Sequence, residues 1–255
     1  MNTSITLEDV SLSFRVYKNK SQSIKEWFTH LLSKEKHEPY TEFWALSNIN
    51  ITVNHGDRLG IVGHNGAGKS TLLKTICNIY TPTKGNVRVE GRVAPLLEIG
   101  AGFNTELSGR DNIYLNGAIL GHTKSTLRSI ESEIISFTEL GDFIDQPVKY
   151  YSTGMYMKLA FAIATAVHPE ILILDELFAG GDAEFIDKAK NRMHEFIEKS
   201  GIMVFVSHQP DLLLQLCNRV IWLDHGKVIA DGNPHEVIQR YLNKQFPTAT
   251  ETEQP

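Results

Sequence analysis

The sequence has few cysteines and no long apolar run, and both shortages restrict what the chain can be. Cys77 and Cys217 are the two cysteines among 255 residues, and they form no CxxC pair. This pattern provides neither a disulfide framework nor a cysteine-based metal site, and it favours a reducing, cytoplasmic setting. No apolar stretch approaches the roughly 18 to 20 residues that span a bilayer, and the N-terminus lacks a signal-peptide pattern. We therefore expect a chain that does not cross a membrane by itself.

An excess of positive charge is also lacking. The 25 lysines and arginines are outnumbered by 30 aspartates and glutamates, which gives a formal net charge of -5. The net charge of the chain therefore does not favour electrostatic binding to DNA or RNA, and we expect no nucleic-acid partner. The 42% hydrophobic and 22% charged residues are instead typical of a globular protein with one large core, or a core plus a subdomain.

The hydrophobic patterns predict an α/β fold. Alternating, β-branched stretches at residues 5–14 and 45–53 predict strands near the N-terminus. Continuous apolar runs at residues 170–176 and 201–208 predict strands buried on both faces of a mostly parallel sheet. The amphipathic helix predicted over residues 183–201 joins these two strands into a βαβ unit.

Two other regions differ from this pattern. Helical spacing prevails through about residues 100–167, which predicts a helical subdomain inserted in the α/β core. The polar, proline-bounded residues 243–255 predict a disordered tail. We therefore assign residues 1–242 to a single domain.

The stretch GHNGAGKST matches the phosphate-loop pattern G-x-x-x-x-G-K-[ST] and stands between a predicted strand and a predicted helix. Its glycines allow backbone N–H groups to converge on phosphate oxygens, and the helix N-terminus adds its positive dipole end. Lys69 would neutralise the β- and γ-phosphate charge, and Ser70 would hold Mg²⁺. The candidate ATP-binding residues of this loop are Gly63, His64, Asn65, Gly66, Ala67, Gly68, Lys69, Ser70 and Thr71.

Acidic and imidazole groups follow two of the buried strands. Asp175 and Glu176 end one strand and His208 follows the next, where ligands of parallel sheets bind. Asp175 can reach Mg²⁺, and Glu176 can polarise an attacking water. The alternative is that the two acids only cap a strand end in solvent. His208 is placed for a γ-phosphate contact, although lone histidines are more often structural.

In their order along the chain, these motifs resemble the ATP-binding cassette (ABC) ATPases. The phosphate loop is followed by YSTGM at residues 151–155, ILILDE, Asp182 and then His208. The resemblance implies a P-loop ABC core with an N-terminal antiparallel β subdomain and an inserted helical subdomain. It also implies that YSTGM is the signature motif, which contacts the γ-phosphate bound to the other subunit of a homodimer. The residues it assigns to this contact are Ser152, Thr153 and Gly154.

The resemblance assigns further roles residue by residue. Asp182 would belong to the D-loop and His208 would be the switch histidine, beside the catalytic Glu176 and Lys69. Phe14 falls where an aromatic residue stacks on adenine, with Tyr17 as the alternative, and Phe14 can equally be an ordinary core residue of a strand. The metal-binding set would be Ser70, Asp175 and Glu98, where Glu98 stands in for the Q-loop glutamine.

Several departures from the common cassette pattern resemble the ATPases of polysaccharide exporters. They are YSTGM itself, LFAGGD at residues 177–182, EIGAGF at residues 98–103 and the insert between the first strands. This branch implies a lipid-linked polysaccharide substrate, two copies of an integral membrane permease, and peripheral attachment to the cytoplasmic face of the bacterial inner membrane. Its cofactors would be ATP and Mg²⁺. The alternatives are a cassette serving another transported substrate and a soluble cassette ATPase without transport.

The insert at residues 21–36 contains a predicted amphipathic helix. In SIKEWFTHLL, residues 23–32, apolar side chains recur at helical spacing. In the family this region resembles a gate helix. The helix can pack on its own domain, or it can place Trp27 and Phe28 at a membrane interface or at the cytoplasmic edge of a transporter. We favour the membrane interface as a hypothesis.

Overall fold

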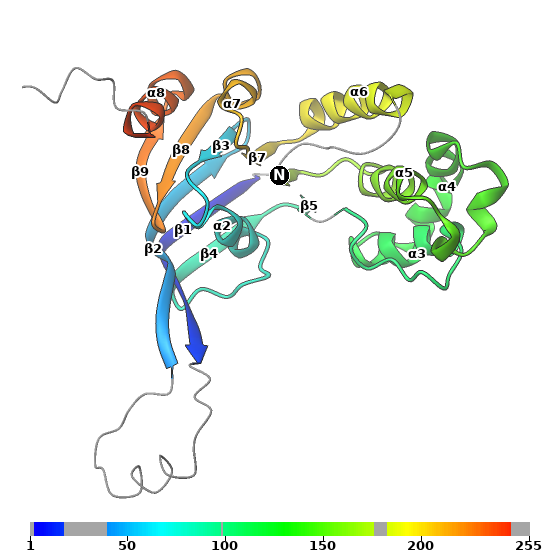
Figure 1. Ribbon diagram of the computed structural model, residues 1–255, viewed down its shortest axis with the longest axis horizontal. Helices are drawn as coiled ribbons and strands as arrows, with labels where there is room; N and C mark the ends of the chain where they lie inside the picture. Colours follow the sequence, from blue (N-terminus) through cyan, green and yellow to red (C-terminus); the bar gives the residue numbers. More distant parts are fainter. Residues whose placement is uncertain (1–2, 18–39, 98, 176–182, 246–255) are drawn as a thin grey trace, which may run out of the picture.

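The computed structural model describes residues 3–17, 40–97, 99–175 and 183–245 (Figure 1). Short 3-10 helices are labelled η. In chain order the elements are β1 Ser4–Tyr17, β2 Tyr40–Asn54, β3 Arg58–Val62, α2 Lys69–Ile76, β4 Lys84–Glu90, β5 Val93–Leu96, α3 Gly109–Ile119, α4 Lys124–Thr138, η1 Gly141–Asp145, η2 Val148–Tyr150, α5 Thr153–Ala164, β6 Ile171–Asp175, α6 Ala183–Lys199, β7 Ile202–Val206, α7 Pro210–Leu216, β8 Arg219–Asp224, β9 Lys227–Gly232 and α8 Pro234–Gln245.

The larger sheet has six strands in the order β5-β6-β7-β3-β8-β9. All neighbouring pairs are parallel except β8 and β9, which form an antiparallel hairpin at one edge. Every residue of β7 is buried, as is every residue of β6 before its last, Asp175. Their continuous apolar sequences therefore reflect burial on both faces, and the mostly parallel sheet predicted from them is confirmed.

The smaller sheet is antiparallel, with strand order β2-β1-β4. Leu72, Leu73 and Ile76 of α2 join side chains from both sheets in one buried core, so this helix packs against the two sheets. β1 and β2 continue farther than the predicted residues 5–14 and 45–53, and the pair extends beyond the rest of the molecule in Figure 1. The pairing of β1 with β2 therefore continues beyond the residues whose alternating hydrophobicity predicted the strands.

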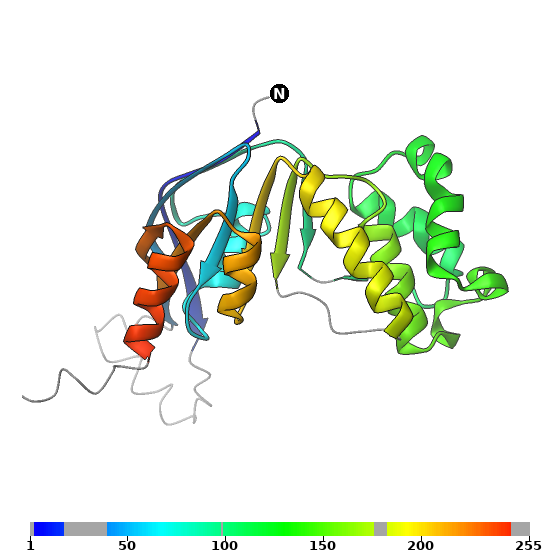
Figure 2. The same ribbon diagram turned by 90° about the horizontal axis from the view of Figure 1, so that it is seen from above.

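The helices α3, α4 and α5 gather to one side of the sheets (Figure 1) around their own core. Each begins at a hydroxyl N-cap, Ser108, Thr123 or Ser152, whose side chain accepts a backbone N–H from the first turn. The helix α6 lies beside α5 (Figure 2), where the rings of Phe185 and Phe161 are 5.9 Å apart. The fold class predicted above, including the inserted helices, is confirmed.

Both cysteines are free thiols. Burial raises the pKa of Cys77 to about 11 and that of Cys217 to about 12, so neither forms an appreciable fraction of reactive thiolate at neutral pH.

Among the helices in the described ranges, none is long and apolar enough to cross a bilayer. The predicted helix at residues 23–32 lies outside these ranges, as does the predicted tail beyond Gln245. The last helix, α8, extends past residue 242 to Gln245.

Candidate functional site

The phosphate loop connects the end of β3 to the start of α2. Gly66 and Gly68 have positive φ angles of 82° and 105°, which L side chains rarely adopt. Gly63 faces a different restriction, because an added Cβ would lie 2.3 Å from the carbonyl oxygen of Leu223 in β8. The glycines therefore serve two needs, a left-handed backbone at the tip of the loop and a close approach to the sheet at its base.

Lys69 is the buried cation of this loop, with 7% of its surface exposed. Its ammonium group donates hydrogen bonds to the carbonyl oxygens of Gly63 at 2.7 Å and His64 at 3.1 Å. These contacts fold the side chain back along the loop, so the charge is held where the backbone N–H groups converge. An anion such as phosphate is the complementary ligand.

Ser70 and Asp175 come together although 105 residues separate them in the chain. The hydroxyl of Ser70 donates to Oδ2 of Asp175 at 3.1 Å. The two side chains supply oxygen ligands from the start of α2 and the end of β6, the type of ligand that Mg²⁺ prefers. This placement fits the predicted metal role of both residues.

A cavity of about 500 Å³ lies over the loop and is large enough for a nucleotide. Besides phosphate-loop residues, it is lined by Phe43, Ala45, Leu97, Asp175 and His208. The cavity therefore brings His208 of the β7–α7 connection to the same site as Lys69, as its position after a buried strand predicts.

Phe43 of β2 is the aromatic side chain in the cavity lining, and sequence reasoning missed it. Phe14 is directly opposite Phe43 in the β1–β2 ladder, yet it packs against the core with its ring 5.4 Å from that of Tyr80. Tyr17 is 64% exposed and contacts Tyr40. Neither of the two residues proposed to stack on adenine lines this cavity, so their predicted role stays untested.

Comparison with known sequences matches residues 46–179, just over half of the chain, to the sequence model described as ABC transporter. The chain belongs to the ABC transporter family. It is an ABC-type ATPase cassette.

The ABC cassette is also similar to curated relatives over most of its length. It is 44% identical over 243 residues to the O-antigen export system ATP-binding protein RfbB of Myxococcus xanthus, covering 93% of this chain and 55% of that protein. It is 43% identical to the O-antigen export system ATP-binding protein RfbE of Yersinia enterocolitica, covering 90% and 98%. The teichoic acids export ATP-binding protein TagH of Lactococcus lactis is 42% identical, with 88% and 46% covered. The chain thus spans about half the length of the Myxococcus and Lactococcus relatives.

Solved structures support the fold. A dimeric ATP-binding cassette in a post-hydrolysis state, bound to ADP and Pi, superposes with a TM-score of 0.64 at 19% identity, covering 90% of this chain and 98% of that one. An ATP-binding subunit of an ABC transporter gives a TM-score of 0.67 at 20% identity, covering 93% and 92%.

The YSTGM motif lies at the N-terminus of α5. Ser152 caps this helix by accepting a hydrogen bond from the N–H of Met155 at 3.2 Å, and both Ser152 and Thr153 are exposed. Ser152, Thr153 and Gly154 do not line the cavity over the phosphate loop of the same chain. The motif therefore presents helix N–H groups outward, which suits a phosphate held elsewhere.

Three of the candidate residues lie outside the described ranges. They are Glu98 of the Q-loop, the catalytic candidate Glu176 and the D-loop residue Asp182. The described part of β6 ends at Asp175, which lines the cavity.

Phe43→Ala is expected to weaken ATP binding by about 2- to 13-fold, equivalent to the roughly 0.5–1.5 kcal/mol of an aromatic stacking pair. Phe14→Ala is the matched comparison. Removing the Phe14 ring should lower the free energy of unfolding by about 3 kcal/mol and leave ATP affinity unchanged. Titration with a fluorescent ATP analogue and urea unfolding measure both effects. If Phe14→Ala alone weakened ATP binding, the adenine would stack where the family resemblance placed it.

Proposed function

We propose that this chain is the ATP-hydrolysing subunit of an ABC exporter that drives a lipid-linked polysaccharide across the bacterial inner membrane. The polymer would be of the O-antigen, capsule or teichoic-acid type. The observation that carries this proposal is the similarity of about nine-tenths of the chain to relatives named for O-antigen export. A related ABC cassette that moves a different substrate is the alternative.

Lys69, Ser70, Asp175 and His208 surround the place of the transferred phosphate. Lys69 offers fixed positive charge, and the backbone N–H groups of the loop orient the phosphate oxygens. Ser70 and Asp175, with Glu98 at the Q-loop, would hold Mg²⁺, which neutralises phosphate charge when it is bound with ATP. Glu176 would accept a proton from the attacking water, and His208 would contact the γ-phosphate. Asp182 would position the D-loop at the subunit contact.

Two copies of the cassette would form the working dimer. Each ATP would lie between the phosphate loop of one copy and Ser152, Thr153 and Gly154 of the other. The outward-facing N-terminus of α5 supports this arrangement, because its capped first turn presents N–H groups away from its own cavity. Closing the dimer would move two permease copies, and hydrolysis would reopen it.

This proposal places the cassette peripherally on the cytoplasmic face of the inner membrane, held there by the permease. The predicted helix at residues 23–32 would then lie near the membrane interface where the lipid-linked substrate enters. The exposed pair Tyr17 and Val16 ends β1 just before this insert. The last two residues of β1 therefore expose apolar surface.

Deleting the gene in its native bacterium is expected to remove the polysaccharide from the cell surface and to leave lipid-linked polymer inside. Complementation with the wild-type gene should restore the surface polymer. The measurement is the amount of lipid-linked polymer extracted from whole cells, compared with the amount labelled on the surface of intact cells. A strain that lacks the polymer's first glycosyltransferase is the control, because it loses the surface polymer without accumulating any inside. Normal surface polymer after deletion would contradict the export function and leave the ATPase assignment standing.

A further inference from the structure

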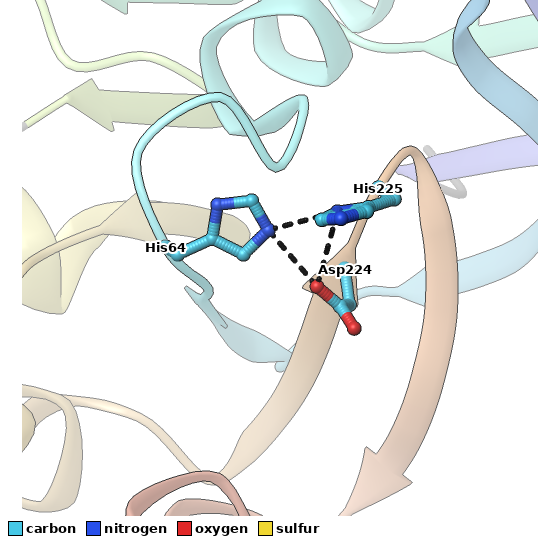
Figure 3. Close-up of side chains that lie close together, drawn as sticks. All are labelled: His64, Asp224 and His225. Atoms are coloured by element: carbon cyan, nitrogen blue, oxygen red, sulfur yellow. Dashed lines mark hydrogen bonds and ion pairs between the residues drawn. The ribbon is translucent and has the colours of Figure 1, made fainter. Parts of the chain in front are cut away.

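The side chains of His64, Asp224 and His225 point toward one another beside the phosphate loop (Figure 3). His64 belongs to the loop, whereas Asp224 ends β8 and His225 begins the turn to β9. Nε2 of His64 is 2.9 Å from Oδ1 of Asp224 and 3.1 Å from Nδ1 of His225. Nδ1 of His225 is 3.5 Å from the same Asp224 oxygen. Three atoms able to bind a metal thus converge outside the nucleotide cavity.

The other ring nitrogen of His64 decides what these three atoms can do. Nδ1 lies 2.6 Å from the carbonyl oxygen of Asn65, which can only accept, so Nδ1 carries a proton. In the neutral ring, Nε2 is therefore a bare lone pair that faces the Asp224 carboxylate. A metal ion between Nε2 and the carboxylate oxygen, which are 2.9 Å apart, would satisfy both acceptors.

The distances fit a small transition-metal ion. Zinc binds nitrogen and oxygen at about 2.0–2.2 Å, which separates neighbouring ligands of a tetrahedron by roughly 3.3–3.5 Å. The shortest of the three separations, 2.9, 3.1 and 3.5 Å, would need to open by about 0.4–0.6 Å. The exposed fractions of the His64 and His225 side chains, 38% and 78%, leave one side of the cluster open for a water as fourth ligand.

Lys244 of α8 contacts the other carboxylate oxygen of Asp224. Its ammonium group donates to Oδ2 of Asp224 at 2.6 Å. Oδ2 is therefore already engaged, and Asp224 offers the single oxygen Oδ1 to the cluster. Imidazole-bound metal ions have such partners behind their ligands, which fix the ligand's orientation.

We propose that His64, Asp224 and His225 form a binding site for a transition-metal ion of the zinc class, which ties the phosphate loop to the β8–β9 turn. Two imidazoles and one monodentate carboxylate favour Zn²⁺ over Mg²⁺ and Ca²⁺, which need more oxygen ligands. The Mg²⁺ that accompanies ATP therefore does not compete for this site. The ion would be held apart from Ser70 and Asp175.

Titration of the untagged, nucleotide-free full chain with Zn²⁺ tests the proposal in isothermal calorimetry. The wild type is expected to bind one equivalent in the presence of millimolar Mg²⁺, and Co²⁺ should give the visible absorption bands of a tetrahedral site. His225→Ala and Asp224→Asn should each weaken Zn²⁺ binding by at least about 10-fold. Removing a residue that only supports a metal ligand already weakens metal binding by about 10-fold or more, and removing the ligand itself should weaken it at least as much.

His235→Ala is the matched control, because His235 is an exposed histidine at the start of α8 outside the cluster. It should bind Zn²⁺ as the wild type does. Far-UV circular dichroism confirms that each variant is folded, and His225 is exposed enough to be replaced without a core defect. The proposal fails if the wild type binds no stoichiometric Zn²⁺, or if His225→Ala binds it unchanged. Either result would leave the three side chains as a hydrogen-bonded cluster that holds no metal ion.

Discussion

Replacing Glu176 with glutamine is expected to preserve ATP binding and to reduce hydrolysis by roughly 10²- to 10⁴-fold, the contribution of a positioned general base. Glutamine has the same size and can still contact water, but its amide cannot accept the water's proton. The residue before it, Asp175, lines the cavity and accepts a hydrogen bond from Ser70. Glu176 is the next residue in the sequence.

Single-turnover release of phosphate from purified protein measures the chemical step, and a fluorescent ATP analogue measures binding. Glu170→Gln is the matched control, because it makes the same substitution just before β6 begins. Glu170 forms a 3.6 Å ion pair with Arg92, and 69% of the Arg92 side chain is exposed. Loss of this exposed ion pair should change the free energy of unfolding by less than about 1 kcal/mol. Hydrolysis at the wild-type rate in Glu176→Gln would exclude Glu176 as the base.

The sequence predicted which residues lie together around the phosphate loop, because most of that information is local. Within nine consecutive residues, GHNGAGKST supplies the glycines, the cation and the hydroxyl that the site needs. The partner Asp175 could also be placed, because a parallel strand that is apolar on both faces must end at the edge where ligands bind. Local pattern and sheet topology together fixed the relation between α2 and β6.

The positions of the residues that sequence reasoning missed depend on the register between strands and on turns far away in the chain. Phe43 enters the cavity lining through the pairing of β2 with β1, and the insert between these strands hides that register from a sequence pattern. The ladder has shifts between Leu7 and Val10 and again on either side of Leu12, so counting along the strand could not choose between Phe14 and Phe43.

The cluster of His64 with Asp224 and His225 was beyond sequence reasoning for a related reason. His64 is 160 positions from Asp224 and 161 from His225, and the motif gives His64 only as a variable position of the loop. What brings them together is the parallel pairing of β3 with β8, which ends both strands at the same edge. Long-range pairing of this kind is not specified by any local pattern.

Lys69→Met is expected to weaken ATP binding by about 10- to 150-fold, the equivalent of one charged hydrogen bond of roughly 1.5–3 kcal/mol. Methionine is close to lysine in length and tolerates burial, so the loop should keep its shape while the cavity loses its fixed positive charge. The carbonyl groups of Gly63 and His64 lose their donor, and we therefore expect a lower melting temperature as well.

Lys74→Met separates the effect of this one charge from a general change in α2. Lys74 lies in the last turn of the same helix and does not line the nucleotide cavity, so the substitution removes the same charge at a distance from the phosphates. Its ATP affinity should stay near that of the wild type at a temperature where both variants are folded. Equal loss of affinity in the two variants would mean that the general field of α2 attracts the nucleotide. A loss confined to Lys69→Met would assign the attraction to the ammonium group buried in the loop.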